Sequence, residues 1–203
     1  MSVCSALSNA ASVSHFTAVN TSSSSSFLLP VEEYDIITKP LFLDNNYFFE
    51  VTEPEEISYT YKMRPAKDFG ARLNSTYVNI KLMLTDPVHG CSAISNDITD
   101  SVAFIERGGC SFLGKTINAE RAGARMVIIM DHNIDNDYRM VDMIQDETAR
   151  SAGIPAFFLI GKDGHMIRRT LEKLKLTSAL INVPINITGI PLSRVNHPPW
   201  SFW

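Results

Sequence analysis

A change in hydrophobic periodicity near the middle of the chain does most to limit what it can fold into. Before that point, short runs rich in aromatic and β-branched residues predict strands over 47–52, 57–62 and 77–84. After it come two strand–helix–strand passages, over 102–105, 111–123 and 126–130, and over 156–160, 163–175 and 180–187. Two helices are too few to cover both faces of a doubly wound parallel sheet. The sequence therefore predicts an α/β or α+β domain of short strands with two or so flanking helices.

The composition divides the chain of 203 residues into three parts. Residues 1–43 are rich in Ser, Asn and Thr, which predicts a disordered tail. Residues 44–190 hold the predicted strands and helices, enough for one domain with its own core. Residues 191–203 form a tail rich in Pro and aromatic residues. No signal peptide is recognised in residues 1–30, which lack Lys and Arg and have no long apolar run.

Charge and hydropathy exclude several classes of function. The net charge is −4, which argues against a general phosphate-binding surface, so we expect no nucleic-acid partner. A membrane-spanning helix needs roughly 20 apolar residues. The longest purely apolar runs, Met126–Met130 and Ala156–Ile160, are far shorter than that, so we expect no membrane span. No G-x-S-x-G or H-E-x-x-H motif is present, and we predict no catalytic residue, metal or other cofactor.

One segment matches a phosphate-binding loop by its letters. Gly109–Thr116 reads G-x-x-x-x-G-K-T, follows a predicted strand and opens a predicted helix, and Asp131 follows the next apolar strand. A nucleotide-binding protein is therefore an alternative. Against it, the bulky Phe112 and Leu113 fit poorly in a loop whose backbone must meet a polyanion. In the simpler interpretation this segment is a helix N-terminus with Lys115 facing solvent.

Three cysteines, Cys4, Cys91 and Cys110, are too few for a disulfide scaffold or a four-thiolate zinc site. Cys91 precedes the predicted strand 102–105 and Cys110 follows it, so both can lie at one end of the sheet. A bridge between them, two reduced thiols, and Cys110 as a nucleophile all remain open at this point. The acidic stretch 131–142 is only a weak candidate for a calcium loop, since Asn136 stands where Gly is needed and Asp142 where Glu is needed.

A longer pattern overlaps the phosphate-loop match. From Arg107 the chain follows R-G-x-C-x-F-x-x-K-x-x-x-A-x-x-A-G-A and then an apolar strand. This segment resembles the core signature of protease-associated domains, and its matching residues include Arg107, Gly108, Cys110, Phe112, Lys115, Ala119 and Gly123. The resemblance implies a β-barrel-like domain with a few flanking helices and no catalytic residues of its own. In this family such a domain serves as a lid, insert or ligand-recognition module.

The resemblance also implies a compartment and modifications. It supports a Cys91–Cys110 disulfide, and it favours a secreted, stand-alone domain that binds a protein or peptide, despite the unrecognised signal peptide. Three N-x-[ST] sequons, at Asn20, Asn74 and Asn186, are then candidates for glycosylation. An accessory or lid subunit of a peptidase is a further alternative.

The C-terminal end, "PPWSFW", is too apolar to remain in water without partners. We expect Trp200, Phe202 and Trp203 to pack back on the domain. The alternative is that they bind a partner, because tryptophan-rich anchors dominate interface energies. The basic residues of 162–175 are expected to form a solvated helix face.

Overall fold

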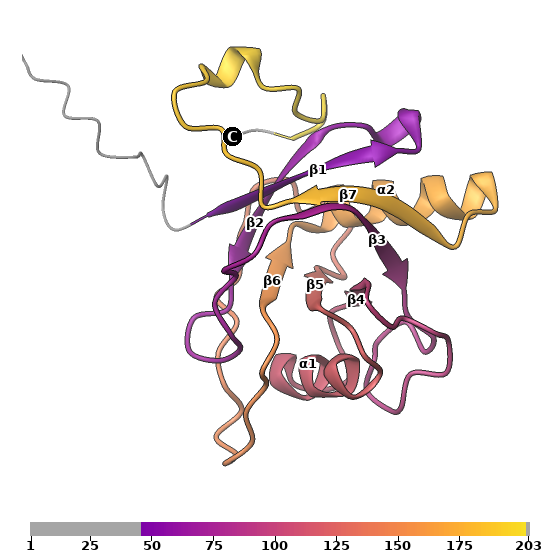
Figure 1. The fold of residues 1–203 in the computed structure, drawn as a ribbon, viewed down its shortest axis with the longest axis vertical. Helices are drawn as coiled ribbons and strands as arrows, with labels where there is room; N and C mark the ends of the chain where they lie inside the picture. The colour runs from indigo at the N-terminus through magenta and orange to yellow at the C-terminus, as the bar shows by residue number, and fades with distance from the viewer. Residues whose placement is uncertain (1–45, 202–203) are drawn as a thin grey trace, which may run out of the picture. The chain divides into compact units, whose positions relative to one another are not determined.

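The computed structural model describes residues 46–201, which form a closed barrel of seven strands with two α-helices (Figure 1). The predicted tail 1–43 and its Asn20 lie outside the described residues. The strands are β1 (Tyr47–Glu53), β2 (Thr60–Pro65), β3 (Tyr77–Leu84), β4 (Val102–Glu106), β5 (Met126–Met130), β6 (Ala156–Leu159) and β7 (Ser178–Val183). The helices are α1 (Phe112–Arg121) and α2 (Gly161–Leu174), with 3-10 turns η2 (Glu55–Ile57) and η3 (Leu192–Arg194). The predicted α/β class, barrel-like sheet and two helices are confirmed.

The barrel combines a parallel half with an antiparallel half. Its strands follow the order β1-β2-β6-β5-β4-β3-β7, and β7 pairs with β1 to close it. The pairs β3/β4, β4/β5 and β5/β6 are parallel, whereas the pairs β1/β2, β1/β7, β2/β6 and β3/β7 are antiparallel. The carboxyl ends of β4, β5 and β6 therefore meet at one edge, where the loops that follow them lie side by side.

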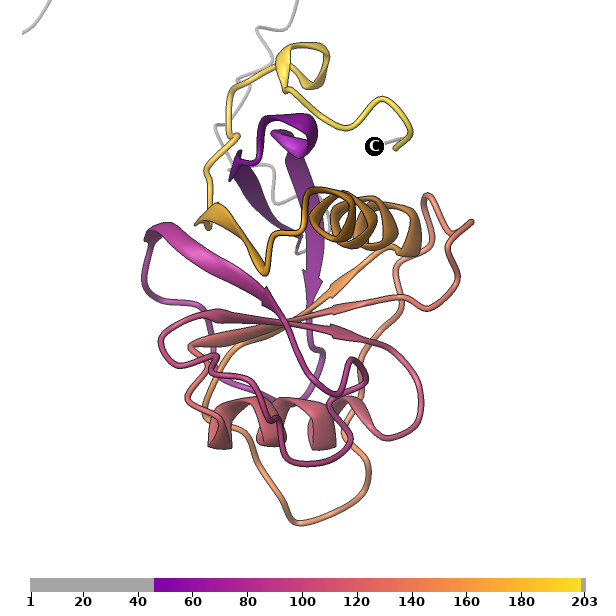
Figure 2. The ribbon, with the colours of Figure 1, turned by 90° about the vertical axis from the view of Figure 1, so that its right-hand side faces the viewer.

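The central parallel strands are buried on both faces, which is why they are continuous apolar runs. Side chains alternate between the faces, so Phe104 and Ile128 enter one cluster and Ile105 and Ile129 enter another. Helix α2 contributes Ile167 and Leu171 to the first cluster, inside the barrel. Helix α1 contributes Ala119 to the second cluster, and Figure 2 shows the two helices on opposite sides of these strands.

Helix α2 begins where the backbone leaves no room for a side chain. A Cβ atom on Gly161 would lie 1.8 Å from the carbonyl oxygen of Asn133 in the loop after β5. Only glycine fits such a close approach. The predicted start at Asp163 is therefore two residues late, and the helix begins at Gly161 itself.

Three predicted strands differ in detail from the structure. The prediction 57–62 is wrong at its start, because Glu55–Ile57 is a 3-10 turn and β2 begins at Thr60. The prediction 180–187 is wrong at its end, since β7 stops at Val183 before Pro184, which has no N–H to donate. The alternation in 77–84 also breaks at Val78, which is 70% exposed. The cause is Asn79, whose φ of 54° shifts the register with β7.

Candidate functional site

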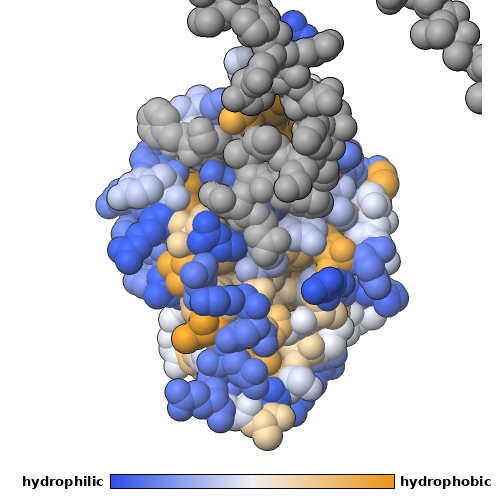
Figure 3. Space-filling model, turned by 90° about the vertical axis from the view of Figure 1, so that its left-hand side faces the viewer, coloured by the Kyte–Doolittle hydropathy of each residue, from blue (hydrophilic) through white to orange (hydrophobic). Residues whose placement is uncertain are grey.

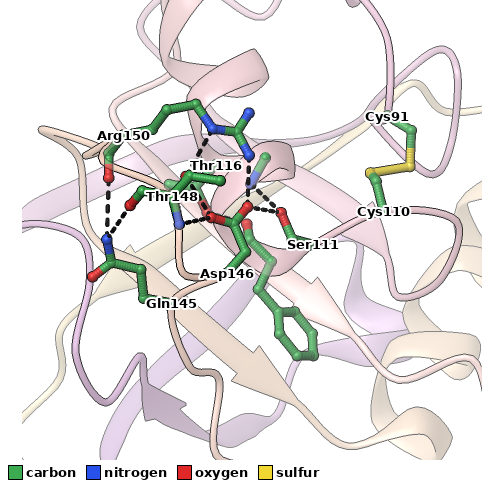
Figure 4. Close-up of polar contacts among 10 residues, drawn as sticks. Cys91, Cys110, Ser111, Thr116, Gln145, Asp146, Thr148 and Arg150 are labelled. Carbon is green, nitrogen blue, oxygen red and sulfur yellow. Dashed lines mark hydrogen bonds and ion pairs between the residues drawn. A yellow bond between two sulfur atoms is a disulfide. The ribbon is translucent and has the colours of Figure 1, made fainter.

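The signature residues from Arg107 to Lys115 lie at the corner between β4 and α1, whereas Ala119 and Gly123 lie at the other end of the helix. Gly108 and Gly109 have φ values of 116° and 79°, a region that side-chain-bearing residues rarely adopt, so the chain can turn sharply here. This turn brings Cys110 to Cys91, and the two form a disulfide (Figure 4). The predicted pairing is present in the structure. A bridged Cys110 is not a free nucleophile.

Lys115 lies inside this corner, fully buried, so the interpretation that it faces solvent is wrong. Its Nζ donates hydrogen bonds of 2.5 Å to the carbonyl oxygens of His89 and Gly108 and lies 3.5 Å from Cys91 Sγ. Burial lowers the pKa of Lys115 to about 8, while the negative charge of Glu106 acts in the opposite direction. Lys115 therefore joins the two chain segments that carry the disulfide.

The first turn of α1 is held by a carboxylate from a distant loop. Ser111 is the N-cap residue, and its Oγ accepts a 3.0 Å hydrogen bond from the backbone N–H of Gly114. The same hydroxyl donates to Asp146 Oδ2 at 2.5 Å. Thr148 Oγ1 and Arg150 Nη2 each donate to Asp146 at 2.6 Å (Figure 4). These bonds lower the pKa of Asp146 to about 2, and the bond from Ser111 has the largest effect.

This arrangement does not match a phosphate-binding loop. Asp146 places a negative charge at the N-terminus of α1, where a phosphate would have to sit. Lys115 directs its ammonium group to backbone carbonyls rather than toward that position. Phe112 packs in the cluster around β4 and β5. The contacts of Gly109–Thr116 thus stabilise the fold and give no support to nucleotide binding.

Asp146 belongs to a long loop, residues 131–155, that is anchored along its length. Met143 is fully buried, and its carbonyl oxygen accepts a 2.9 Å hydrogen bond from the backbone N–H of Lys67. The backbone N–H of Gln145 donates to Asp68 Oδ1 at 2.7 Å. Asp142 forms a 3.0 Å ion pair with Arg64. The loop is therefore fastened to the segment that follows β2.

The start of this loop is organised by Asp131, which is buried. Asp131 Oδ1 lies 3.1 Å from Arg107 Nη1 and 3.3 Å from His132 Nδ1, and Oδ2 accepts a 2.8 Å hydrogen bond from Asn136 Nδ2. These bonds occupy the carboxylate that the calcium-loop interpretation assigned to a metal. Within residues 46–201, no group of three or more His, Cys, Asp or Glu side chains is placed to hold a metal ion.

A hollow of about 480 Å³ opens between the signature corner and this loop. We call it the Arg107 cleft, and its lining includes Arg107, Asp131, His132, Tyr138 and Arg139. The guanidinium of Arg107 lies over the ring of Phe112, 5.8 Å from its centre. Tyr138 is 74% exposed and the nearby Ile134 is 52% exposed. The cleft thus combines cationic, acidic and aromatic groups at a rim open to solvent.

A second hollow, of about 510 Å³, lies beside the segment after β2. Its lining includes Tyr47, Lys67, Phe69, Arg72 and Phe157. On the face of the molecule in Figure 3, hydrophobic residues form small separate groups among hydrophilic ones.

The sequon and tail residues occupy different parts of the surface. Asn74 and Asn186 are both exposed. Trp200 packs edge-on against Tyr59, with ring centres 5.6 Å apart, so the tail returns to the domain there as expected. Phe202 and Trp203 lie outside the described residues. None of the helices described is long and apolar enough to cross a membrane.

Sequence reasoning missed Asp146 and, elsewhere in the domain, Asp163, which is buried in the first turn of α2. Each carboxylate meets partners more than 30 positions away in the chain, Ser111 for the first and Ser201 for the second. An acidic residue in a polar loop or in a first helical turn is common, so no local pattern distinguishes them. The eight-residue match at Gly109–Thr116 also gave no sign that Lys115 is buried.

Comparisons with known proteins assign this architecture to a family. Residues 78–167 match the family model described as PA domain. The chain is 44% identical over 184 residues to "PRADC1-like protein" of Drosophila melanogaster, covering 89% of this chain and 91% of that protein. The chain belongs to the PA domain family. As the resemblance implied, this PA domain carries the signature residues at the β4–α1 corner and builds the expected barrel.

Other relatives of this PA domain are larger proteins. "Signal peptide peptidase-like 4" of Oryza sativa subsp. japonica is 33% identical over 99 residues, which cover 49% of this chain and 18% of that protein. The solved aminopeptidase of Aneurinibacillus sp. strain AM-1 aligns with a TM-score of 0.50 at 18% identity, covering 68% of this chain and 30% of that one. At this identity the structural likeness supports the fold alone.

Proposed function

We propose that this chain is a non-catalytic, secreted glycoprotein whose stand-alone PA domain binds a protein or peptide at the Arg107 cleft. The observation that carries the proposal is the loop 131–155, which is anchored by buried and polar contacts yet exposes Tyr138 at the cleft. Long ordered loops without regular secondary structure are uncommon in domains and frequently serve in binding. A rigid, exposed tyrosine offers contact area at a low entropic cost.

The lining of the cleft indicates what kind of peptide it would take. Tyr138 would contact an aromatic or aliphatic side chain, because it lines the cleft and is largely exposed to solvent. Arg139 is exposed and would pair with a carboxylate. Arg107 already shares its charge with Asp131 and is better suited to a backbone carbonyl. We therefore expect a ligand that combines an apolar anchor with an acidic residue.

The test is selection of peptides from a displayed random library by the full chain, followed by affinity measurements. Tyr138→Ala should weaken binding of the selected peptides at least tenfold, about 1.4 kcal/mol. Val78→Ala is the matched control, because Val78 is 70% exposed but lies on β3, outside the lining of the cleft. Selected peptides that bind Tyr138→Ala as tightly as the unaltered chain would contradict the assignment of the cleft.

Secretion and glycosylation rest on separate observations. The disulfide requires an oxidising compartment to persist, and the sequon residues Asn74 and Asn186 are both accessible. We expect protein collected from culture medium to lose mass on endoglycosidase treatment. Most of this loss of mass should be absent in Asn186→Gln. The Asn20 sequon remains a prediction. Unmodified protein confined to the cytosol would contradict both parts of the proposal.

A second candidate function is an accessory or lid subunit of a peptidase. It is favoured by the peptidase names of several relatives in which a PA domain occupies a small part of the chain. Co-purification with a peptidase from medium, and a change in that enzyme's activity on adding this chain, would distinguish it from simple peptide binding. Micromolar binding of Mg²⁺-ATP would instead revive the nucleotide-binding alternative.

A further inference from the structure

The C-terminal segment 195–201, here called the latch, closes over one end of the barrel. The carbonyl oxygen of Asn196 accepts a 2.7 Å hydrogen bond from the backbone N–H of Thr60, and Asn196 Nδ2 donates to the carbonyl of Ser58 at 2.9 Å. Trp200 adds its ring contact with Tyr59. The latch therefore binds the chain that leads into β2 through backbone and side-chain contacts.

The deepest contact of the latch is with Asp163, in the first turn of α2. This side chain is only 1% exposed. Its Oδ1 accepts hydrogen bonds from Trp200 Nε1 at 3.0 Å and from Ser201 Oγ at 2.5 Å. Its Oδ2 is buried and makes no hydrogen bond. Both donors that satisfy Asp163 thus come from the latch, and one oxygen is left without a partner.

This geometry makes the closed state sensitive to the charge on Asp163. A buried carboxylate with an unpaired oxygen is destabilising when it is ionised and far less so when it is neutral. If the latch leaves, water reaches Asp163 and the ionised form is no longer penalised. Protonation therefore favours the closed state over the open one.

We propose that residues 195–201 form a reversible latch that protonation of Asp163 closes, so that it is held more tightly in mildly acidic surroundings than at neutral pH. The proposal concerns the barrel end at α2 and does not depend on what the Arg107 cleft binds. It would let the same chain present a different C-terminal surface in compartments of different acidity.

The electrostatic surroundings support this direction. Burial raises the pKa of Asp163 to about 6, and the bonds from Ser201 and Trp200 oppose the rise only in part. The charges of Lys62 on β2 and Lys162 on α2 also oppose it. Tyr61 of β2 stays neutral, because burial and the charge of Asp163 raise its pKa far above the usual range. Further titratable groups on neighbouring segments include Glu55 and Glu56 in η2, Tyr59 before β2, Arg64 on β2, His165 on α2 and His197 in the latch.

The pKa values set the size of the effect. With a pKa of about 6 in the closed state and an ordinary value near 3.9 in the open state, the closing equilibrium is about tenfold more favourable at pH 5 than at pH 7.5. Well below pH 4 both states are protonated and the dependence disappears.

The experiment is residue-resolved hydrogen exchange on the full chain at pH 5 and pH 7.5, corrected for the intrinsic pH dependence of exchange. The amide of Thr60 reports the latch, because it donates to Asn196. The amide of Val127, within β5, reports unfolding of the barrel. We expect the opening constant at Thr60 to rise about tenfold from pH 5 to pH 7.5 and to become independent of pH in Asp163→Asn.

Two controls make each result decisive. His197→Gln removes the titratable side chain of the latch and should leave the tenfold change intact; its loss there would overturn the proposal. Equal changes at Thr60 and Val127 in the unaltered chain would mean that only global unfolding responds, which also overturns it.

Fluorescence provides a second readout of the latch. The two tryptophans of the chain are at 200 and 203, so in Trp203→Phe the fluorescence of Trp200 alone follows the latch. Its quenching by acrylamide should be weaker at pH 5.

Discussion

Removing the disulfide, by Cys91→Ser together with Cys110→Ser, is expected to lower the free energy of unfolding by about 3 kcal/mol. The bridge joins residues 19 positions apart, and closing a loop of that length restricts the unfolded chain by about this amount in the chain-entropy treatment. For a domain of this size, the corresponding fall in melting temperature is roughly 6–12 °C. Both cysteines are replaced so that neither thiol is left to form a new bridge.

A related prediction concerns how Lys115 and the disulfide together stabilise the corner. The bridge and Lys115 both hold the segments at His89 and Gly108 together, so their contributions should not be independent. Lys115→Met is expected to destabilise the domain on its own, because two carbonyl groups lose charge-assisted donors. Combined with the cysteine replacements, it should cost less than the sum of the separate effects, by at least about 0.5 kcal/mol.

The assay is urea denaturation without reductant, monitored by far-ultraviolet circular dichroism, on the four proteins of this double-mutant cycle. Ser92→Ala serves as the control, since Ser92 is exposed next to the bridge and should leave the midpoint unchanged. Equal midpoints for the unaltered chain and the double cysteine variant would refute the entropic reasoning. Strict additivity with Lys115→Met would refute the shared role of the corner.

Three further predictions concern single residues. Burial raises the pKa of Asp163 from its usual value near 3.9 to about 6, so its contribution to stability is fully present well below pH 4 and is lost as the pH rises through 6. Denaturation at different pH values should therefore show a fall of about 2 kcal/mol in the free energy of unfolding between pH 4 and pH 7.5, absent in Asp163→Asn. Ser111→Ala should lower the free energy of unfolding by about 1–2 kcal/mol in the same assay, because the amide of Gly114 loses its cap, whereas Ser111→Thr should retain most of it. Gly161→Ala should lower it by about 3 kcal/mol or more, because the new methyl group would overlap the carbonyl of Asn133, and a melting temperature equal to that of the unaltered chain would contradict the packing described at the start of α2.

The parts of the fold that could be predicted are those whose periodicity is local. β3 and β5 have the predicted bounds, because each stretch of strand-forming residues ends at a turn or a polar loop. Helix α1 begins one residue after its predicted start, since Ser111 is its cap. Where the outcome depends on partner strands, prediction failed: Val78 turns outward because Asn79 is bulged against β7, and a single strand does not encode its neighbour's register.

For the candidate site, the motif identified the corner but not its chemistry. Arg107, Cys110 and Lys115 were singled out together, and all three do lie around one turn. Whether a lysine after a glycine-rich turn faces a ligand or a backbone carbonyl depends on segments such as that at His89, which sequence reasoning does not place. Asp163 likewise accepts a hydrogen bond from Ser201, 38 positions further along the chain, which no local pattern indicates.

The closed barrel restricts how this domain can recognise anything. Each of the seven described strands has hydrogen-bonded neighbours on both sides, so no long row of free backbone groups is offered to an extended peptide. Recognition by adding a strand to a sheet edge, a common way of binding peptides, is therefore closed to this part of the chain. A partner must instead be bound by side chains of the connecting loops. The same closure leaves none of these seven strands with a free edge through which two copies of the chain could pair.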